Sequence, residues 1–600
     1  MLNLRFSSIF GRALISCDSS YSRSLQTLRS RFSSSTSINN EAFELEIDDL
    51  LVNLQELAVW PEDDTDIRWQ TELLRLVESN AADAATLDDR LAADPDAVPS
   101  QQAVFSPRWS GDLTDFQRRD LTKLRSLGHG ANFSVPGAGK TRVALAVFEA
   151  SRALGQVSRL LVVCPKSAFE SWEVESGICF ANPPLRAGIM TSSVPPITEV
   201  VLINYERLPD ATSTLVTWLR AAPAMLILDE AHRMKLGPAG AWGSACLALG
   251  PYAVKRLILT GTPAPNGAED LANLFAFVWP GQGRAAVTRA LQDDDLRAAS
   301  VKLRPLFART TKSQLQLPPV DLFVRRINLP PLHRALYNAL LGQASAQWRG
   351  GEGDIEALGK ILLYLLMAAT TPALLATGAS RHEPLAYRIP PLQPLPDSTL
   401  SELMRDLPHY ELSPKYQEVI AIVAANAAIG RKTLVWSTFV RNLKSLESLL
   451  ARFSPAIVHG GTVDRAGELA RFRQDPSCMV LLSNPATLGE GVSLHQVCHD
   501  AVYVDRDFGA GRFLQSLDRI HRLGLGPDVE TRITILVADQ TIDEIVEQRL
   551  AAKLLFMGSV LDDPAVLRLG DLDEEPSVWA GMNEDDRGSL IRYLSGNASI

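Results

Sequence analysis

The sequence predicts an α/β fold in which two parallel-sheet lobes are separated by a helical insert and preceded by a helical N-terminal region. Three observations support this prediction. The chain has 600 residues, which is too long for one hydrophobic core. Two stretches alternate short apolar, β-branched runs with helical segments, the pattern of parallel strands buried between helices. The stretch between them shows helical periodicity.

The alternating stretches set the expected lobe boundaries. The first predicts a lobe over residues 105–320, with strands near residues 160–163, 200–203, 225–228 and 256–259. The second predicts a lobe over residues 413–550, with strands near residues 433–436, 456–458, 479–482, 501–504 and 533–537. Residues 321–412 are expected to form a helical protrusion and a linker.

The two ends of the chain differ in composition from the lobes. Residues 1–40 contain five arginines, many serines and a single acid, Asp18, which predicts a disordered or targeting-like segment. Residues 41–104 are expected to form an acidic helical region, because leucines recur on one helical face. Residues 551–600 are expected to form a C-terminal brace with an acidic tail.

Composition excludes several classes of protein. The net charge of −10 argues against a global basic field, although a local basic cleft remains compatible with it. The six cysteines form no C-x-x-C pair, so neither a zinc ribbon nor a disulfide framework is indicated. The most apolar stretch, residues 361–377, contains Thr370 and Thr371 and is broken by Pro372, which predicts a buried helix rather than a membrane span.

A glycine-rich turn precedes a helix-like segment in the first lobe. In such a turn, backbone N–H groups cradle phosphates and a lysine reaches the outer phosphates. Ser134 stands where the strict pattern has its first glycine. The residues of the turn are Gly137, Ala138, Gly139, Lys140 and Thr141.

An acidic pair, Asp229 and Glu230, follows the apolar run of residues 225–228. A carboxylate at the end of a buried strand is suited to hold the magnesium ion of a nucleotide. Together with the glycine-rich turn, this pair predicts that the protein binds and hydrolyses a nucleoside triphosphate.

Residues 113–553 resemble a Swi/Snf-type motor of helicase superfamily two, an ATP-driven translocase on double-stranded DNA with two RecA-like lobes. The motifs occur in the order expected for that family. The acidic residues that usually precede the phosphate loop are absent. Residues 259–263 with Asn266 are one of the strongest matches. The family's pattern also includes His232, Arg233 and Lys235 after the acidic pair, and residues 515–524.

The resemblance implies a complete ATP and Mg²⁺ site. Thr141 and Asp229 would hold Mg²⁺, Glu230 would polarise the attacking water, and Gln117 would read the adenine. The implied ATP-binding set is Gln117, Gly137, Ala138, Gly139, Lys140, Thr141 and Gly491. The implied catalytic set is Lys140, Asp229, Glu230 and two arginines of the second lobe, Arg519 and Arg522.

The resemblance also implies contacts with a DNA strand from loops at strand ends, mostly through phosphates. The implied contact residues are Lys166, Tyr205, Thr260, Ser437, Ser483 and Asn484.

The expected function is therefore ATP-dependent translocation on duplex DNA, which remodels DNA or protein–DNA complexes in DNA repair, restriction or phage defence. Two alternatives are an RNA-dependent ATPase or helicase, and a nucleotide-switched DNA-binding scaffold with little turnover. Because the chain shows no targeting module, a protein partner is expected to supply target choice. A bacterial cytoplasm is the expected location, with a mitochondrion or nucleus as the alternative if residues 1–40 are a transit peptide.

Overall fold

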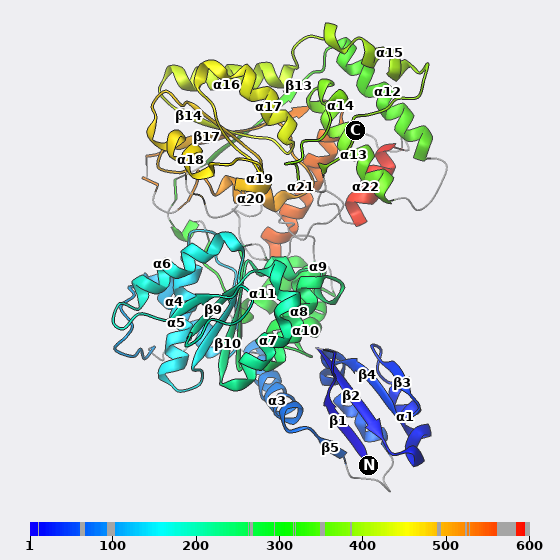
Figure 1. The fold of residues 1–600 in the computed structure, drawn as a ribbon, viewed down its shortest axis with the longest axis vertical. Coiled ribbons are helices and arrows are strands. Elements are labelled where there is room, and N and C mark those ends of the chain that lie inside the picture. Colours follow the sequence, from blue (N-terminus) through cyan, green and yellow to red (C-terminus); the bar gives the residue numbers. More distant parts are fainter. Residues whose placement is uncertain are drawn as a thin grey trace. The chain divides into compact units, whose positions relative to one another are not determined.

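The computed structural model describes the chain except residues 10, 61–66, 93–102, 262, 264–267, 293–294, 312, 316, 319, 349–354, 385–386, 489–491, 493, 523–524, 527, 561–583 and 595–600. The described residues fall into two compact units, formed mainly by Met1–Thr311 and by Lys312–Gly558. Figure 1 labels many of the elements of both units, and each unit is described by itself below.

The first unit begins with a small sheet domain, drawn in blue in Figure 1. Its strand order is β3-β4-β2-β1-β5, and the neighbours pair antiparallel except for β1 and β5. The strands are β1 (Leu2–Phe6), β2 (Arg12–Cys17), β3 (Thr36–Asn39), β4 (Ala42–Glu46) and β5 (Ile67–Trp69). Helices α1 (Ser22–Arg29) and α2 (Ile47–Val52) complete its core, which buries Leu4, Ile15 and Phe43.

The prediction of a disordered or targeting-like segment over residues 1–40 is therefore wrong. Alternate side chains of β1 and β2 are buried, and this period of two was the sequence signal for strands. The serines that suggested a transit peptide belong to this folded domain. For example, the backbone N–H and the hydroxyl of Ser34 both donate to Asp49 Oδ2 at 2.7 Å. The expected helical region of residues 41–104 likewise contains two strands, β4 and β5, beside its helices.

The rest of the first unit is lobe 1, a seven-stranded parallel sheet in the order β12-β6-β11-β10-β7-β9-β8. Its strands are β6 (Gly130–Asn132), β7 (Arg159–Val163), β8 (Ala187–Ile189), β9 (Val200–Ile203), β10 (Ala224–Asp229), β11 (Lys255–Leu259) and β12 (Phe307–Ala308). Helix α3 (Thr71–Ala92) precedes lobe 1 in the chain. The helices of lobe 1 include α4 (Asp115–Ser126), α5 (Lys140–Ala153), α6 (Phe169–Cys179), α8 (Ala241–Leu249) and α9 (Ala268–Val278).

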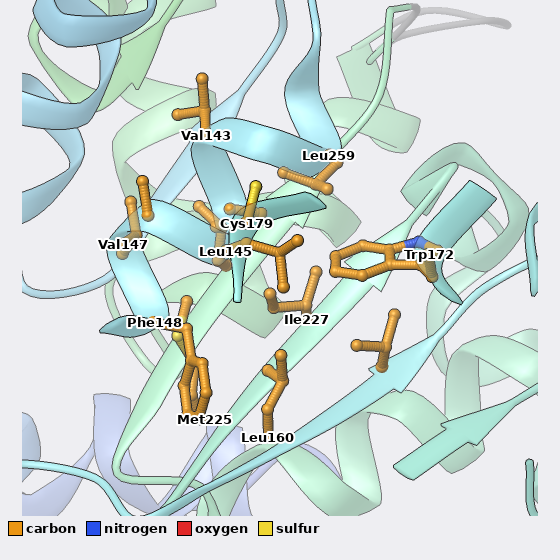
Figure 2. Packing of buried hydrophobic residues seen from close by; sticks show 14 of the residues in the cluster. Val143, Leu145, Val147, Phe148, Leu160, Trp172, Cys179, Met225, Ile227 and Leu259 are labelled. Carbon is orange, nitrogen blue, oxygen red and sulfur yellow. The ribbon is translucent and has the colours of Figure 1, made fainter. Parts of the chain in front are cut away.

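The core of lobe 1 lies between this sheet and its helices. Figure 2 shows apolar side chains of α5 beside those of the central strands and the indole of Trp172. The labelled residues of this core include Val143, Val147, Phe148, Leu160, Met225, Ile227 and Leu259. Because every strand of the sheet runs in one direction, the loops that follow the strands meet at one edge.

The second unit contains a six-stranded parallel sheet in the order β13-β18-β17-β14-β16-β15. Its strands are β13 (Val320–Ile327), β14 (Lys432–Trp436), β15 (Ala456–Val458), β16 (Val480–Ser483), β17 (Cys498–Tyr503) and β18 (Thr531–Ala538). Its helices include α16 (Pro414–Ala428), α17 (Val440–Leu449), α18 (Arg465–Gln474), α20 (Ala510–Leu517) and α21 (Ile542–Val560).

The expected helical protrusion begins later than predicted, because β13 belongs to the second sheet. All eight residues of β13 pair with β18, from Val320 opposite Thr531 to Ile327 opposite Ala538. The helices that follow are α12 (Pro331–Trp348), α13 (Ile355–Thr370), α14 (Ala373–Ala376) and α15 (Thr399–Arg405). In α13, Leu362, Leu365 and Leu366 are buried. Among the described residues, no helix is long and apolar enough to cross a membrane.

We predict that Ile15→Ala destabilises the N-terminal sheet domain by about 2–5 kcal/mol, because Ile15 is fully buried and its loss leaves a cavity. Denaturant unfolding monitored by hydrogen exchange of residues 1–59 measures this change. The matched control is Ile38→Ala, which removes a side chain that is 53% exposed on β3 and should leave stability within about 0.5 kcal/mol. Equal effects of the two substitutions would contradict a folded N-terminal domain.

Candidate nucleotide site

The glycine-rich turn joins β6 to α5 at the edge of the lobe 1 sheet where the strands end. Gly137 and Gly139 have φ angles of +86° and +77°, a left-handed conformation that glycine adopts without a steric penalty. Gly139 is the N-cap of α5, so the helix begins at Lys140 with its N-terminal N–H groups directed into the turn. Lys140 Nζ donates to the carbonyl oxygen of Ser134 at 3.0 Å, which holds the ammonium over the turn. This geometry suits a polyphosphate.

Gln117 lies against the turn. Its Oε1 accepts from the backbone N–H of Thr114 at 3.0 Å, and its Nε2 donates to the carbonyl oxygen of Ala138 at 3.2 Å. A Cβ atom added to Gly139 would collide with Gln117 Nε2. The structure therefore gives Gln117 a role in shaping the turn, and its contact with adenine stays a prediction.

A buried carboxylate that the sequence analysis missed, Asp120, fixes the start of the same turn. Its Oδ2 accepts from the hydroxyls of Ser134 and Thr310, both at 2.9 Å. The backbone N–H of Thr310 donates to Ser134 Oγ at 2.8 Å, so the three side chains close a ring of hydrogen bonds. The available signal was the position of Asp120 three residues after Gln117, on the same face of α4.

The acidic pair stands at the end of β10, the strand between β7 and β11. Asp229 is 8% exposed, and its carboxylate accepts from Trp172 Nε1 at 2.8 Å and from the backbone N–H of Glu230 at 3.0 Å. Burial, followed by the charge of Glu230, raises the pKa of Asp229 to about 6, although Trp172 and Lys140 act in the opposite direction. A buried carboxylate of this kind is stabilised by an added cation.

These residues fit a magnesium ion that is carried in with a nucleotide. Mg²⁺ typically takes one or two protein oxygens together with phosphate oxygens and water. Asp229 and the hydroxyl of Thr141, the second residue of α5, would supply those protein oxygens. Among the described residues there is no cluster of three or more His, Cys, Asp or Glu side chains that would hold a metal without a substrate.

Glu230 is linked to the strand that carries Thr260. It has a φ of +49°, and its Oε2 lies 3.5 Å from His232 Nδ1. The same nitrogen lies 3.2 Å from Thr260 Oγ1, and His232 is fully buried. The imidazole of His232 therefore lies between Glu230 and Thr260, the residue that follows β11. A displacement of Thr260 would act on Glu230 through this imidazole.

The second unit contains both predicted arginines. Arg519 is 7% exposed, and it donates from Nε to the carbonyl oxygen of Gln515 at 2.9 Å and from Nη1 to that of Val492 at 3.0 Å. Arg522 is half-buried. The structure thus uses Arg519 to hold the segment around Val492 and leaves Arg522 more exposed. Gly491 lies outside the described residues, as do Thr262 and Asn266.

Most of the predicted DNA contacts are buried side chains. Tyr205 donates from its hydroxyl to the carbonyl oxygen of Asp229 at 2.9 Å, Ser437 Oγ donates to Asp505 at 2.6 Å, and Ser483 Oγ donates to Val458 at 2.6 Å. These three residues and Thr260 are fully buried, so their side chains are not exposed to DNA in this structure, and a contact through their loops stays a prediction. Lys166 is exposed directly after β7, and Asn484 is 1% exposed with neither amide atom hydrogen-bonded among the described residues.

Comparison with known proteins agrees with this geometry. Residues 133–370 match the family described as the SNF2-related domain. The chain is 24% identical to a chromodomain-helicase-DNA-binding protein 1-like of Danio rerio, over 74% of this chain and 43% of that protein. It is 23% identical to the ISWI chromatin-remodeling complex ATPase ISW2 of Saccharomyces cerevisiae, over 81% of this chain and 44% of that protein. The chain thus spans less than half the length of these two relatives.

A solved structure of a Sulfolobus solfataricus SWI2/SNF2 ATPase core in complex with double-stranded DNA also aligns with the chain. It is 20% identical and has a TM-score of 0.35, covering 78% of this chain and 96% of that one.

Residues 133–370 therefore resemble the SNF2-related domain, and the predicted resemblance to the Swi/Snf type of helicase superfamily two is confirmed. Enzymes of this class are ATP hydrolases that use ATP with Mg²⁺.

We predict that Trp172→Phe shifts the pH dependence of Mg²⁺-nucleotide binding. Losing the indole donor destabilises the charged form of Asp229, so its pKa rises above about 6 and the carboxylate is protonated at a higher pH. Binding of Mg²⁺-ADP, measured by calorimetry between pH 5 and 8, should weaken at a higher pH than in the wild type. Trp242→Phe is the matched control, because its ring packs near Tyr205 rather than on Asp229. An unchanged midpoint would show that the indole does not tune the carboxylate.

We predict that Gly139→Ala abolishes nucleotide binding, because the new Cβ strains a backbone at φ +77° and collides with Gln117 Nε2. Gly155→Ala, at φ +71° with no atom within 4 Å of the added Cβ, carries similar backbone strain without the collision. Binding of a fluorescent ATP analogue should be lost in the first variant and kept in the second. Retained binding in both variants would contradict the role of the turn.

Proposed function

We propose that this protein is a DNA-dependent ATP hydrolase that moves along duplex DNA and remodels DNA or protein–DNA complexes. The observation that carries the proposal is the shared position of Lys140, Asp229 and Glu230. All three follow strands of one parallel sheet and stand at the same edge, around a turn shaped for phosphates. The similarity to a chromodomain-helicase-DNA-binding protein supports the choice of DNA over RNA.

Each residue has one role in the proposed hydrolysis. The N–H groups of the turn and the ammonium of Lys140 bind the β- and γ-phosphates. Glu230 orients and polarises the attacking water, and accepts its proton. Asp229 and Thr141 would hold a Mg²⁺ ion, which would supply positive charge beside the phosphates.

The second lobe is proposed to supply the remaining positive charge. Arg522 is proposed to act as the arginine finger that stabilises charge developing on the γ-phosphate. Arg519 is proposed to position the segment around Val492, because its Nη1 donates a hydrogen bond to the carbonyl oxygen of Val492. Hydrolysis would then control the association of the two lobes and so drive stepping.

DNA would be bound through its phosphates, with Lys166 as the one predicted contact whose side chain is exposed among the described residues. A protein partner is proposed to choose the target, and DNA repair, restriction and phage defence are the candidate settings. A bacterial cytoplasm is the proposed location of the protein.

We predict strong stimulation of ATP hydrolysis by duplex DNA. Steady-state rates would be measured without nucleic acid and with duplex DNA, single-stranded DNA, forked DNA or RNA. Glu230→Gln should lower the stimulated rate by about 10²- to 10⁴-fold, because it removes the general base but keeps the shape of the site. Lys140→Ala should weaken binding of ATP as well as the rate.

Arg289→Gln is the matched control, because Arg289 is exposed on lobe 1 and belongs to none of the motifs. Stimulation by RNA alone would transfer the protein to the RNA-dependent ATPases. A rate that no nucleic acid changes, with ATP still bound, would favour the nucleotide-switched scaffold.

We predict that Arg522→Gln lowers the DNA-stimulated kcat by about 10³-fold with little change in ATP binding, because a finger acts on the transition state. Arg519→Gln should instead alter the DNA concentration needed for half-maximal stimulation, since Arg519 donates hydrogen bonds to two backbone carbonyl groups of its own lobe. The reverse pattern would exchange the proposed roles of the two arginines.

A further inference from the structure

The N-terminal sheet domain and helix α3 are joined to lobe 1 by specific contacts. Asp48 Oδ1 accepts from the backbone N–H of Gly281 at 2.5 Å, and Asn80 Nδ2 donates to the carbonyl oxygen of Pro280 at 2.5 Å. Gly281 has a φ of +78°, and an added Cβ would lie 2.9 Å from Leu51 Cβ. The backbone of lobe 1 is thus shaped to receive α2 closely.

A second set of contacts lies on α3, where Asp83 meets two buried groups of lobe 1. Asp83 Oδ2 is 2.9 Å from His129 Nε2 and 3.2 Å from Arg256 Nη2. His129 is 4% exposed and Arg256 is 3% exposed. Among the described residues, Asp83 is the one carboxylate in ion-pair contact with Arg256. The carboxylate of Asp83 on α3 therefore neutralises the guanidinium of Arg256, which is buried in lobe 1.

The contacts of the imidazole involve both other members of this triad. His129 Nδ1 accepts from the backbone N–H of Arg256 at 3.0 Å, so a neutral ring carries its proton on Nε2, which lies 2.9 Å from Asp83 Oδ2 and 3.0 Å from Arg256 Nη2. Burial and the neighbouring guanidinium lower the pKa of His129 to about 4, in agreement with a neutral ring. Arg256 also donates from Nε to the carbonyl oxygen of Val278 at 2.9 Å, at the end of α9.

The triad touches the two strands that lead into nucleotide-site motifs. His129 directly precedes β6, which ends just before the phosphate-binding turn. Arg256 lies on β11, which is followed by Thr260, and Thr260 contacts His232 beside Glu230. We propose that the N-terminal sheet domain and α3 form an allosteric input to the ATP site, acting through Asp83, His129 and Arg256 on β6 and β11. This inference rests on the proposed ATPase activity.

The test uses the full chain with Asp83→Asn, which keeps the size of the side chain and removes its charge. The affinity for a non-hydrolysable ATP analogue should fall at least about fivefold, the lower end of usual allosteric coupling, and the DNA-stimulated kcat should fall with it. Hydrogen exchange should accelerate in residues 130–141 and 255–261, while β7 and β10 keep their protection. Glu72→Gln is the matched control: it neutralises another α3 acid, in an exposed ion pair with Arg220 at 2.5 Å, and should change kcat less than twofold.

A second variant, Gly281→Ala, and the hydrogen exchange of α3 in the wild type also test the proposal. Gly281→Ala should detach the sheet domain from lobe 1 and lower the DNA-stimulated kcat, as is expected for Asp83→Asn. If Asp83→Asn does not fold, Gly281→Ala provides the test. Since coupling is reciprocal, a non-hydrolysable ATP analogue with Mg²⁺ should slow exchange in α3 of the wild type.

Faster exchange at β6 and β11 with unchanged kcat would overturn the proposal, as would faster exchange throughout the lobe 1 sheet. A wild type that binds the analogue but does not hydrolyse ATP would overturn the proposed function alone. In that case the exchange of α3 on analogue binding would still decide the allosteric proposal.

Discussion

The nucleotide site depends on the parallel pairing of β10 with both of its neighbours. Asp229 is opposite Leu259 of β11, and Leu228 is opposite Val163 of β7, so three strands end at one level. The loops that follow them, and the turn after β6, therefore converge without any long connection across the sheet. A shift of one residue in β10 would turn Asp229 toward the other face of the sheet. The register of this strand is thus the constraint on which the chemistry rests.

Burying polar groups next to that edge requires partners for each of them. Trp172 Nε1 and the backbone N–H of Glu230 donate hydrogen bonds to Asp229, whereas the hydroxyls of Ser134 and Thr310 donate to Asp120. These hydrogen bonds hold the carboxylates of Asp229 and Asp120 in fixed orientations. The site is therefore organised before a nucleotide binds, which is what electrostatic stabilisation of a transition state requires.

The same solution recurs in the second unit, where Asp505 follows β17. Its carboxylate accepts from Ser437 Oγ at 2.6 Å, from the backbone N–H of Thr438 at 2.7 Å and from Asn442 Nδ2 at 3.0 Å. Motif residues that looked like DNA contacts thus serve as internal supports for the loops. A motif can be functional because its side chains hold a loop in place, without reaching the ligand themselves.

The sequence by itself determined the two parallel-sheet lobes, the phosphate turn and the acidic pair, because glycine, lysine and carboxylate spacing at strand ends is a local property of the chain. It did not predict the N-terminal sheet, since short alternating runs such as Leu2 to Phe6 were outweighed by arginine and serine content. Only the tertiary structure decided which polar side chains are buried, so the supports from Asp120 and Trp172 and the triad of Asp83, His129 and Arg256 emerged there. Their partners lie far apart in the chain, 173 residues from Asp83 to Arg256, and no local pattern records such a contact.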